Sequence, residues 1–282
     1  MAKKVRIGLI QMAMSSDTLA NVKKAVFMTI EAVNKGAKIV CLPELYKTLY
    51  FPQDKKKNVK KNLESQKGES YKTFSAIAKE KKVTLIIPIF EVAGNKHYNT
   101  ALVIGDKGKL LSAYRKMHIP HDPKFYEKNY FSEGNRGYKV VKTKYGKISP
   151  LICFDQWFPE AARINALNGA EILFYPTAIG SFADNDTPED MHDGWETVQR
   201  GHAIANGVHV VAVNRVGKEG DLKFWGQSFV CDSFGKIIAK ASKDKEEVLL
   251  ADLDLSYNDF IKNGWGFMRN RRPDSYKRIL QK

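Results

Sequence analysis

Cysteines and long apolar runs are scarce in this sequence of 282 residues. Its three Cys cannot form the disulfide framework of a small secreted domain, and an odd number fits a reducing compartment. No apolar run approaches the ~20 residues that a membrane-spanning helix needs. The N-terminus enters an apolar strand pattern at once, at residues 5–12, and does not resemble a signal peptide. We therefore expect a soluble cytoplasmic protein with no membrane partner.

Acidic residues are also in deficit, because 31 Asp and Glu face 46 Lys and Arg and leave a net charge of +15. A large positive charge can indicate nucleic-acid binding. Here 36 of the 46 basic residues are Lys, which mostly act as hydrated surface charges, whereas Arg reads phosphates and bases. The densest run, at residues 55–61, contains no aromatic residue. We expect a solvated lysine-rich surface and no nucleic-acid partner; the alternative predicts binding that weakens steeply with salt.

Sequence motifs for cofactors and metals are missing. The chain has no Gly-x-Gly-x-x-Gly or P-loop pattern, which argues against a nucleotide cofactor. His118 and His121 share one loop pattern, and His192 and His202 share a helical one, but neither pair has zinc-site spacing. We expect no cofactor and no metal. A Cys–His pair involving one of these histidines stays open.

The remaining composition is that of an ordinary globular protein, with 43% hydrophobic and 11% aromatic residues. Helical spacing of apolar residues, with caps and stops, predicts helices at residues 19–35, 70–82, 158–168 and 188–206. Apolar runs bounded by turn signals predict strands at residues 5–12, 38–42, 83–90, 98–104, 109–114, 138–143, 147–153, 171–176, 208–214, 224–231 and 247–253.

The order of these elements indicates the fold class. Strands that alternate with helices are typical of α/β proteins, while the hairpin-like pairs at 83–116 and 224–241 require mixed sheets. We expect an α/β fold built as a four-layer αββα sandwich with two mixed β-sheets. No composition break marks a linker, so we expect a single domain over residues 1–282. Its C-terminal tail, residues 264–282, would pack on a neighbouring subunit.

Three polar residues stand where apolar strands end, which is where catalytic groups gather in α/β proteins. Glu44 follows the strand at 38–42, Lys116 follows the strand ending at Tyr114, and Cys153 ends the strand at 147–153. Taken alone, Glu44 also fits a first-turn helix acid, and Lys116 is one lysine among many. Their common position at strand ends makes them candidates.

The three cysteines differ in their sequence surroundings. Cys41 and Cys231 lie inside apolar strand patterns and are typical of small core residues. Cys153 stands just before a helix that starts near Pro159, where the helix dipole favours a thiolate. The residues alone leave two interpretations of Cys153 open, a nucleophile or a buried structural thiol.

One segment runs against the positive charge of the chain. Residues 184–193 contain five acids, Asp186 among them, and no Lys or Arg. The segment follows the strand at 171–176, on the expected catalytic edge. It is either a solvated loop with first-turn acids for the next helix, or a binding site for a cationic group of a ligand.

Three motifs around the strand-end residues resemble a known family. Residues 42–45 (Leu-Pro-Glu-Leu), 114–120 (Tyr-Arg-Lys-Met-His-Ile-Pro) and 152–160 (Ile-Cys-Phe-Asp-Gln-Trp-Phe-Pro-Glu) resemble the Glu, Lys and Cys motifs of the nitrilase (carbon–nitrogen hydrolase) superfamily. The resemblance runs nearly end to end. Within the superfamily, residues 155–163 and 171–180 are most similar to N-carbamoylputrescine amidohydrolases of polyamine synthesis.

The resemblance implies a cofactor-free hydrolysis with a Glu-Lys-Cys triad. Glu44 would be the acid–base, Cys153 the nucleophile, and Lys116 with the backbone N–H of Phe154 the oxyanion stabilisers. Glu127 matches a second family glutamate that holds the substrate and positions the lysine. The family also implies a homo-oligomer, a dimer or an assembly of dimers.

The implied substrate is a small cationic ureido compound, N-carbamoylputrescine, with putrescine, ammonia and carbon dioxide as products. His121, Trp157 and Asp186 are candidate substrate-binding residues, although His121 stands where relatives often have an acid. Two alternatives remain: another ureido or amide hydrolase, such as a β-ureidopropionase-like enzyme, and a catalytically silent binding protein on this scaffold. A β-ureidopropionase substrate ends in a carboxylate and would need a cationic clamp instead of acids.

Overall fold

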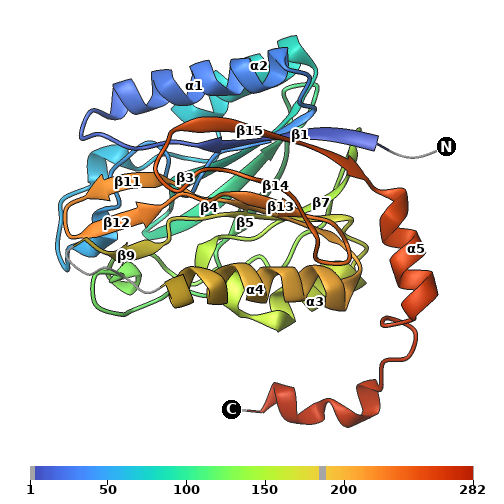
Figure 1. The fold of residues 1–282 in the computed structure, drawn as a ribbon. Helices are drawn as coiled ribbons and strands as arrows, with labels where there is room; N and C mark the ends of the chain where they lie inside the picture. The colour runs from blue at the N-terminus through green and yellow to red at the C-terminus, as the bar shows by residue number, and fades with distance from the viewer. Residues whose placement is uncertain (1–3, 184–188, 282) are drawn as a thin grey trace.

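The computed structural model describes residues 4–183 and 189–281. Two six-stranded mixed sheets form its centre within these ranges, and helices cover the outer face of each (Figure 1). The helices are α1 (Thr18–Asn34), α2 (Glu69–Lys81), α3 (Pro159–Leu167), α4 (Glu189–Asn206) and α5 (Ser256–Trp265). The expectation of an αββα sandwich with two mixed sheets is confirmed.

The first sheet has the strand order β15-β1-β2-β3-β4-β5. Strands β1, β2 and β3 run parallel, and β15 and β4 flank them in the antiparallel direction. Strand β5 pairs antiparallel with β4 and so runs in the same direction as β1, β2 and β3. The strands are β1 (Lys4–Gln11), β2 (Ile39–Cys41), β3 (Thr84–Ala93), β4 (Lys96–Ile104), β5 (Leu110–Arg115) and β15 (Glu247–Asp254). The hairpin expected at 98–114 is confirmed as β4 and β5.

The second sheet repeats this plan with the order β14-β13-β10-β8-β7-β6, in which β7, β8 and β10 are parallel. Its strands are β6 (Val141–Thr143), β7 (Gly146–Pro150), β8 (Ile172–Pro176), β10 (His209–Val213), β13 (Phe229–Cys231) and β14 (Ile237–Lys240). A small sheet of β9 (Gly180–Phe182), β11 (Val216–Glu219) and β12 (Leu222–Trp225) was not expected from the sequence.

The single strand expected at 224–231 is wrong, because the structure divides it into β12 and β13, which belong to different sheets. The chain turns between them at Gly226 and Gln227, whose φ angles are 59° and 52°. This left-handed conformation breaks the extended run.

Alternation along the strands sends apolar side chains into two separate layers of core. Ile7 and Leu9 of β1 join Phe174 and Val211 of the second sheet, which are paired neighbours on one face of that sheet, in the core between the sheets. Ile10 faces the other way and packs with Ala25 of α1 in the core under the helices. Close helix packing also explains Gly8, where an added Cβ would lie 3.0 Å from the Cβ of Ala32. Cys41 and Cys231 are buried in the core, as the sequence predicts.

Two helix starts follow the signals in the sequence. Asp17 caps α1 by accepting from the N–H groups of Leu19 and Ala20. Helix α3 begins at Pro159, as expected. Helix α2 ends at Lys81, and its cap residue Lys82 adopts a left-handed φ of 55° that a lysine does not signal in the sequence.

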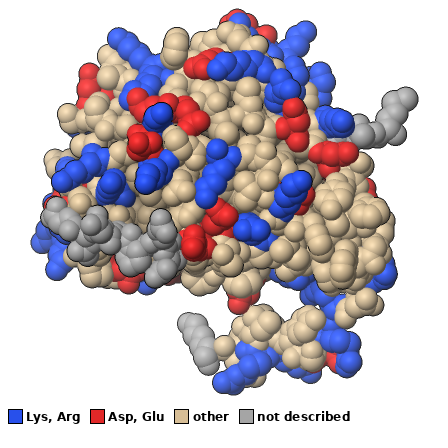
Figure 2. Space-filling view, viewed as in Figure 1, with Lys and Arg blue, Asp and Glu red and all other residues tan. Residues whose placement is uncertain are grey.

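Basic side chains are spread over the visible face of the molecule and are interspersed with acids (Figure 2). Several lysines pair with carboxylates, among them Lys24 with Glu246 at 2.5 Å and Lys240 with Glu196 at 2.7 Å. This face therefore carries no continuous basic stripe. No helix among the described residues is long and apolar enough to cross a membrane.

Candidate active site

The strand-end residues Glu44 and Lys116 meet beyond the carboxyl ends of β2 and β5, which run in the same direction in the first sheet. Glu44 lies just after β2 and Lys116 just after β5, and Lys116 Nζ lies 2.8 Å from Glu44 Oε1. Glu127, at the start of the short 3-10 helix η3 (Glu127–Asn129), supplies a second carboxylate. Cys153 follows β7, and its electrostatic coupling to all three charged groups places it with them. We call these four residues the buried cluster.

The ammonium of Lys116 is saturated with hydrogen bonds. It donates to Glu44 Oε1 at 2.8 Å and to the two oxygens of Glu127 at 2.9 and 2.7 Å. The three bonds match the three protons of the group. The Tyr50 hydroxyl donates to Glu127 Oε1 at 2.7 Å. Since all three charged side chains are fully buried, Lys116 is held in one position.

Glu44 has one occupied and one unoccupied oxygen. Its Oε1 accepts from Lys116 and from Asn99 Nδ2, the latter at 2.7 Å. Its Oε2 is buried without a hydrogen-bond partner among the described residues. A buried carboxylate oxygen without a partner is costly, and it is the oxygen that is free to receive a proton.

Cys153 sits in a strained turn at the start of the 3-10 helix η4 (Cys153–Trp157). Its φ is 42°, a left-handed value that costs a non-glycine residue about 1–3 kcal/mol. The thiol is buried, and its Sγ lies 3.8 Å from the carbonyl oxygen of Ala178. Strain of this kind is concentrated at functional sites.

Phe154 occupies the first turn of η4, directly after the thiol. Backbone N–H groups of a first helical turn have no partner within the helix, so they can donate to an external oxygen. The Phe154 ring packs edge-on against Phe158 at 5.5 Å and takes no part in that role.

The charges of the buried cluster keep the thiol protonated at rest. Burial raises the pKa of Cys153, and the carboxylate of Glu44 raises it further, while Lys116 opposes the shift. Burial alone would lower the pKa of Lys116, but Glu127 and Glu44 outweigh it and the pKa is raised. Burial also raises the pKa of Glu127. A thiolate therefore forms only if a base removes the proton.

Asp155 joins the loop of Cys153 to the loop of Lys116. Its buried carboxylate accepts from the backbone N–H of Ile152 at 2.9 Å and from the Tyr114 hydroxyl at 2.7 Å. It also accepts from the backbone N–H of His118 at 3.1 Å and lies 2.7 Å from the His118 Nδ1. The thiol and the ammonium are thus fixed relative to each other by one side chain.

Two candidate substrate-binding residues, His121 and Trp157, make no direct contact with the buried cluster through hydrogen bonds or ion pairs within residues 4–183 and 189–281. His121 is exposed, and its ring meets Tyr126 edge-on at 5.8 Å. Trp157 is half-buried and packs against a hydrophobic core to which both sheets, α3 and α4 contribute. Asp186 lies outside the described residues, so its place in the site stays a prediction.

The histidines do not form the Cys–His pair that the sequence left open. His118 contacts Asp155 and stacks on Phe158 at 3.6 Å, and the His202 Nε2 lies 2.8 Å from the carbonyl oxygen of Gln156. The Cys153 thiol instead donates to the carbonyl oxygen of Ala178. The described part of the chain contains no group of three His, Cys, Asp or Glu side chains that could hold a metal.

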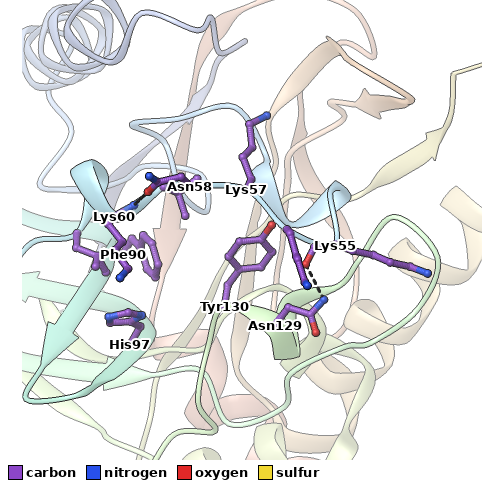
Figure 3. A pocket seen from close by; sticks show the side chains of 11 residues that line it. Lys55, Lys57, Asn58, Lys60, Phe90, His97, Asn129 and Tyr130 are labelled. Atoms are coloured by element: carbon purple, nitrogen blue, oxygen red, sulfur yellow. Dashed lines mark hydrogen bonds between the residues drawn. The ribbon is translucent and has the colours of Figure 1, made fainter.

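A separate cavity of about 500 Å³ lies beside the lysine run at residues 55–61. Phe90, His97 and Tyr130 also line it. Its lysines do not converge on one point. Lys57 points away from the other labelled side chains (Figure 3) and pairs with Asp54 at 3.0 Å, and Lys55 lies over the Tyr126 ring. The cavity contains none of the buried cluster, so the lysine run belongs to the surface.

Comparison with known proteins decides the family. The family model described as carbon-nitrogen hydrolase matches residues 6–262. The chain belongs to the carbon–nitrogen hydrolase family. The resemblance inferred from the three motifs is confirmed.

Relatives of this carbon–nitrogen hydrolase cover nearly its whole length. N-carbamoylputrescine amidase of Solanum lycopersicum is 42% identical, with 98% of this chain and 95% of the relative aligned. Citrullinase of Francisella tularensis is 39% identical over 99% of both chains. The crystal structure of a carbon-nitrogen hydrolase from Helicobacter pylori G27 has a TM-score of 0.94 and 38% identity over 99% of both chains.

Sequence reasoning missed several residues that support the buried cluster in this hydrolase. Tyr50 and Asn99 bond to its carboxylates, and Arg215 holds the backbone of Glu44. Arg215 had the same signal as Glu44, a polar residue within three positions of the end of an apolar strand, and could have been found. Tyr50 had no such signal, since it lies in an irregular segment.

Proposed function

We propose that this protein hydrolyses N-carbamoylputrescine to putrescine, ammonia and carbon dioxide. The observation that carries the choice of substrate is the 42% identity, over nearly full length, to curated N-carbamoylputrescine amidases of several plants. The buried cluster supports the chemistry, because it combines a thiol, a carboxylate with one free oxygen, and a fixed ammonium.

In the first half of the reaction, Glu44 Oε2 takes the thiol proton and Cys153 Sγ attacks the ureido carbonyl carbon. The positive charge of Lys116 and the Phe154 N–H stabilise the oxyanion that forms. The protons of Lys116 stay hydrogen-bonded to Glu44 and Glu127. The intermediate then expels the terminal amino group, and Glu44 returns the proton so that ammonia leaves. Cys153 is left as a carbamoyl thioester of the putrescine nitrogen.

In the second half, Glu44 takes a proton from water, which attacks the thioester carbonyl. The carbon–sulfur bond breaks, the thiol regains its proton from Glu44, and the carbamate of putrescine leaves. This carbamate decomposes to putrescine and carbon dioxide. Glu127 acts on neither bond; it holds Lys116 through two hydrogen bonds.

The raised pKa of the Cys153 thiol supports the proposed roles of Glu44 as the base and Cys153 as the nucleophile. A thiol that burial and Glu44 keep protonated cannot attack without a base, and Glu44 offers the free oxygen. Catalysis by a positioned acid–base contributes typically about 10²–10⁴-fold to rate.

Citrulline is the second candidate substrate, because a curated citrullinase is 39% identical over 99% of both chains. Citrulline carries the same ureido group but ends in both an ammonium and a carboxylate. The two substrates differ at the far end, where His121, Trp157 and Asp186 remain predicted contacts. An acidic contact alone favours N-carbamoylputrescine, whereas an added cationic contact favours citrulline.

The deciding experiment measures kcat/KM for a matched set of ureido compounds. N-carbamoylputrescine, citrulline and N-carbamoyl-β-alanine differ only in the charge and length of the far end. We expect the first to be preferred by at least about tenfold, because each 1.4 kcal/mol of recognition is tenfold. Preference for citrulline or for N-carbamoyl-β-alanine would overturn the substrate proposal while keeping the mechanism.

We also propose that residues 1–282 form one domain whose tail packs on a second copy of the chain. After α5, residues 266–281 run along the outer side of α3 and α4 (Figure 1). Large apolar side chains there are exposed, with Ile279 at 60% and Leu280 at 88% exposure. Exposed apolar groups clustered on one segment are typical of an interface. The free state of all three cysteines supports a cytoplasmic location.

A further inference from the structure

Two adjacent residues, Asn214 and Arg215, follow the carboxyl end of β10 and are fully buried. Their side chains hold two loops that lie far apart in the sequence. One loop carries Glu44, and the other contributes the Ala178 carbonyl that contacts the Cys153 thiol. No role in the reaction mechanism above depends on either residue.

Arg215 holds the backbone at the proposed general base. Its Nη2 donates to the carbonyl oxygens of Glu44 at 2.6 Å and of Leu45 at 3.0 Å. Leu45 has a φ of 49°, a strained value that needs support from its surroundings. Two hydrogen bonds from one guanidinium to consecutive carbonyls provide that support, and they fix the direction in which the Glu44 side chain leaves the backbone.

The same guanidinium reaches the second carboxylate of the cluster indirectly. Arg215 Nη1 donates to both oxygens of Glu219, at 2.8 and 3.0 Å. Glu219 in turn accepts the backbone N–H of Tyr50 at 2.6 Å, and the Tyr50 hydroxyl donates to Glu127. Arg215 therefore fixes Glu44 by bonding to the carbonyl oxygen of Glu44. It fixes Glu127 indirectly, because it holds Glu219, which holds Tyr50.

Asn214 holds the loop on the opposite side of the thiol. Its Oδ1 accepts from the Ile179 N–H at 3.0 Å, and its Nδ2 donates to the Ile179 carbonyl at 2.9 Å. Ile179 is bonded to Ala178, whose carbonyl oxygen lies 3.8 Å from Cys153 Sγ. Asn214 also donates to the Gly226 carbonyl at 3.0 Å, so both ends of its amide are engaged.

From these contacts we infer that Asn214 and Arg215 are positioning residues that set the base and the thiol at their working separation. This inference rests on the proposed roles of Glu44 and Cys153. A planar guanidinium can bond two carbonyls and a carboxylate at once, and a lysine ammonium in its place cannot reproduce that geometry. Displacing reacting groups by about 1 Å can cost on the order of 10²-fold in rate.

The experiment compares Arg215→Lys, Asn214→Asp and Glu219→Gln with a matched buried control, Asn258→Ser. Asn258 bonds His209 Nδ1 at 2.8 Å and the Glu171 carbonyl at 2.8 Å, at the other end of β10. Each variant is measured for kcat and KM on N-carbamoylputrescine, for thermal unfolding, and for the pH-dependent rate at which iodoacetamide alkylates Cys153.

We expect Arg215→Lys and Asn214→Asp to lower kcat by about 10–100-fold with KM changed by less than about threefold, because only the reacting groups move. Alkylation of Cys153 should slow by about tenfold, since the base no longer meets the thiol. Glu219→Gln should show the same pattern more weakly, and Asn258→Ser should lower only the unfolding temperature.

Wild-type kcat and alkylation in folded Arg215→Lys and Asn214→Asp would overturn the inference. Equal losses in Asn258→Ser would also overturn it, because they would trace the effect to general stability. If wild type does not turn over N-carbamoylputrescine, the proposed substrate fails, and the alkylation rates alone still decide the positioning role.

Discussion

Lys116 donates to Oε1 of Glu44 at 2.8 Å, and the other oxygen of Glu44 is buried without a partner among the described residues. One carboxylate therefore does two things. It anchors the Lys116 ammonium, and it leaves one oxygen without a partner among the described residues, which under the proposed mechanism would take the thiol proton. The division explains why the cluster needs a second carboxylate, because Glu127 completes the coordination of Lys116.

Replacing Glu44 by Gln removes the proton acceptor and keeps the size of the side chain. We expect kcat to fall by about 10²–10⁴-fold, the usual contribution of a positioned acid–base. Glu69→Gln is the matched control, because Glu69 is 73% exposed and its ion pair with Lys47 lies on the surface. Steady-state ammonia release checks both variants. A Glu44→Gln enzyme with wild-type kcat would remove the residue from the mechanism.

The strained turn at Cys153 predicts an order of stability between two variants that lack the thiol. Glycine adopts a φ of 42° without strain, whereas alanine retains the cost. Cys153→Gly should therefore be more stable than Cys153→Ala by about 1 kcal/mol. Urea unfolding gives the comparison, and the opposite order would show that the turn is not strained.

The buried pair of Glu91 and Arg115 predicts a pH-dependent loss of stability. Burial raises the pKa of Glu91, but hydrogen bonds from Arg115, Thr100 and Gln66 outweigh it, so the pKa is lowered from 4.5. A lowered carboxyl pKa stabilises the fold above the unfolded-state value, and the contribution is lost as the pH falls through the folded-state value.

Glu91→Gln should therefore destabilise the protein by about 3 kcal/mol at pH 7, because it leaves Arg115 without its buried partner. At pH values well below 4.5 the gap between variant and wild type should shrink. Urea unfolding at about pH 7 and pH 3 measures the gap. An unchanged gap at both values would contradict the assignment.

The exposed tail predicts a change of assembly. Ile279→Asp combined with Leu280→Asp places two charges on side chains that are 60% and 88% exposed. If a second copy covers them, the double variant should shift to smaller species in sedimentation velocity, because buried unpaired charges oppose association. Gln281→Asp, beside them in the sequence, is the control. An unchanged sedimentation coefficient for the double variant would remove the tail from the interface.

Much of the fold could be predicted because its signals are local. Alternating apolar strands, the cap at Asp17 and the turn between β4 and β5 each depend on a few consecutive residues. The division between β12 and β13 could not be predicted, because Gln227 adopts a left-handed φ that its side chain does not favour. Tertiary packing imposes that turn.

In the candidate site, the residues proposed to react could be predicted from the sequence, but the contacts that orient them could not. Position at a strand end made Glu44, Lys116 and Cys153 candidates, and the family motifs supplied the roles. The residues that orient them are distant in the sequence. Arg215, for example, bonds to the carbonyl oxygen of Glu44, from which it is separated by 171 positions. Such a contact leaves no local pattern, and only the arrangement of the two sheets brings the residues together.

The most direct test of the central proposal is the product balance of N-carbamoylputrescine with wild type and with Cys153→Ala. We predict that wild type releases one putrescine and one ammonia for each substrate consumed, and that Cys153→Ala, although folded, releases neither. Release of putrescine by Cys153→Ala, or consumption of the compound by wild type without putrescine, would contradict it.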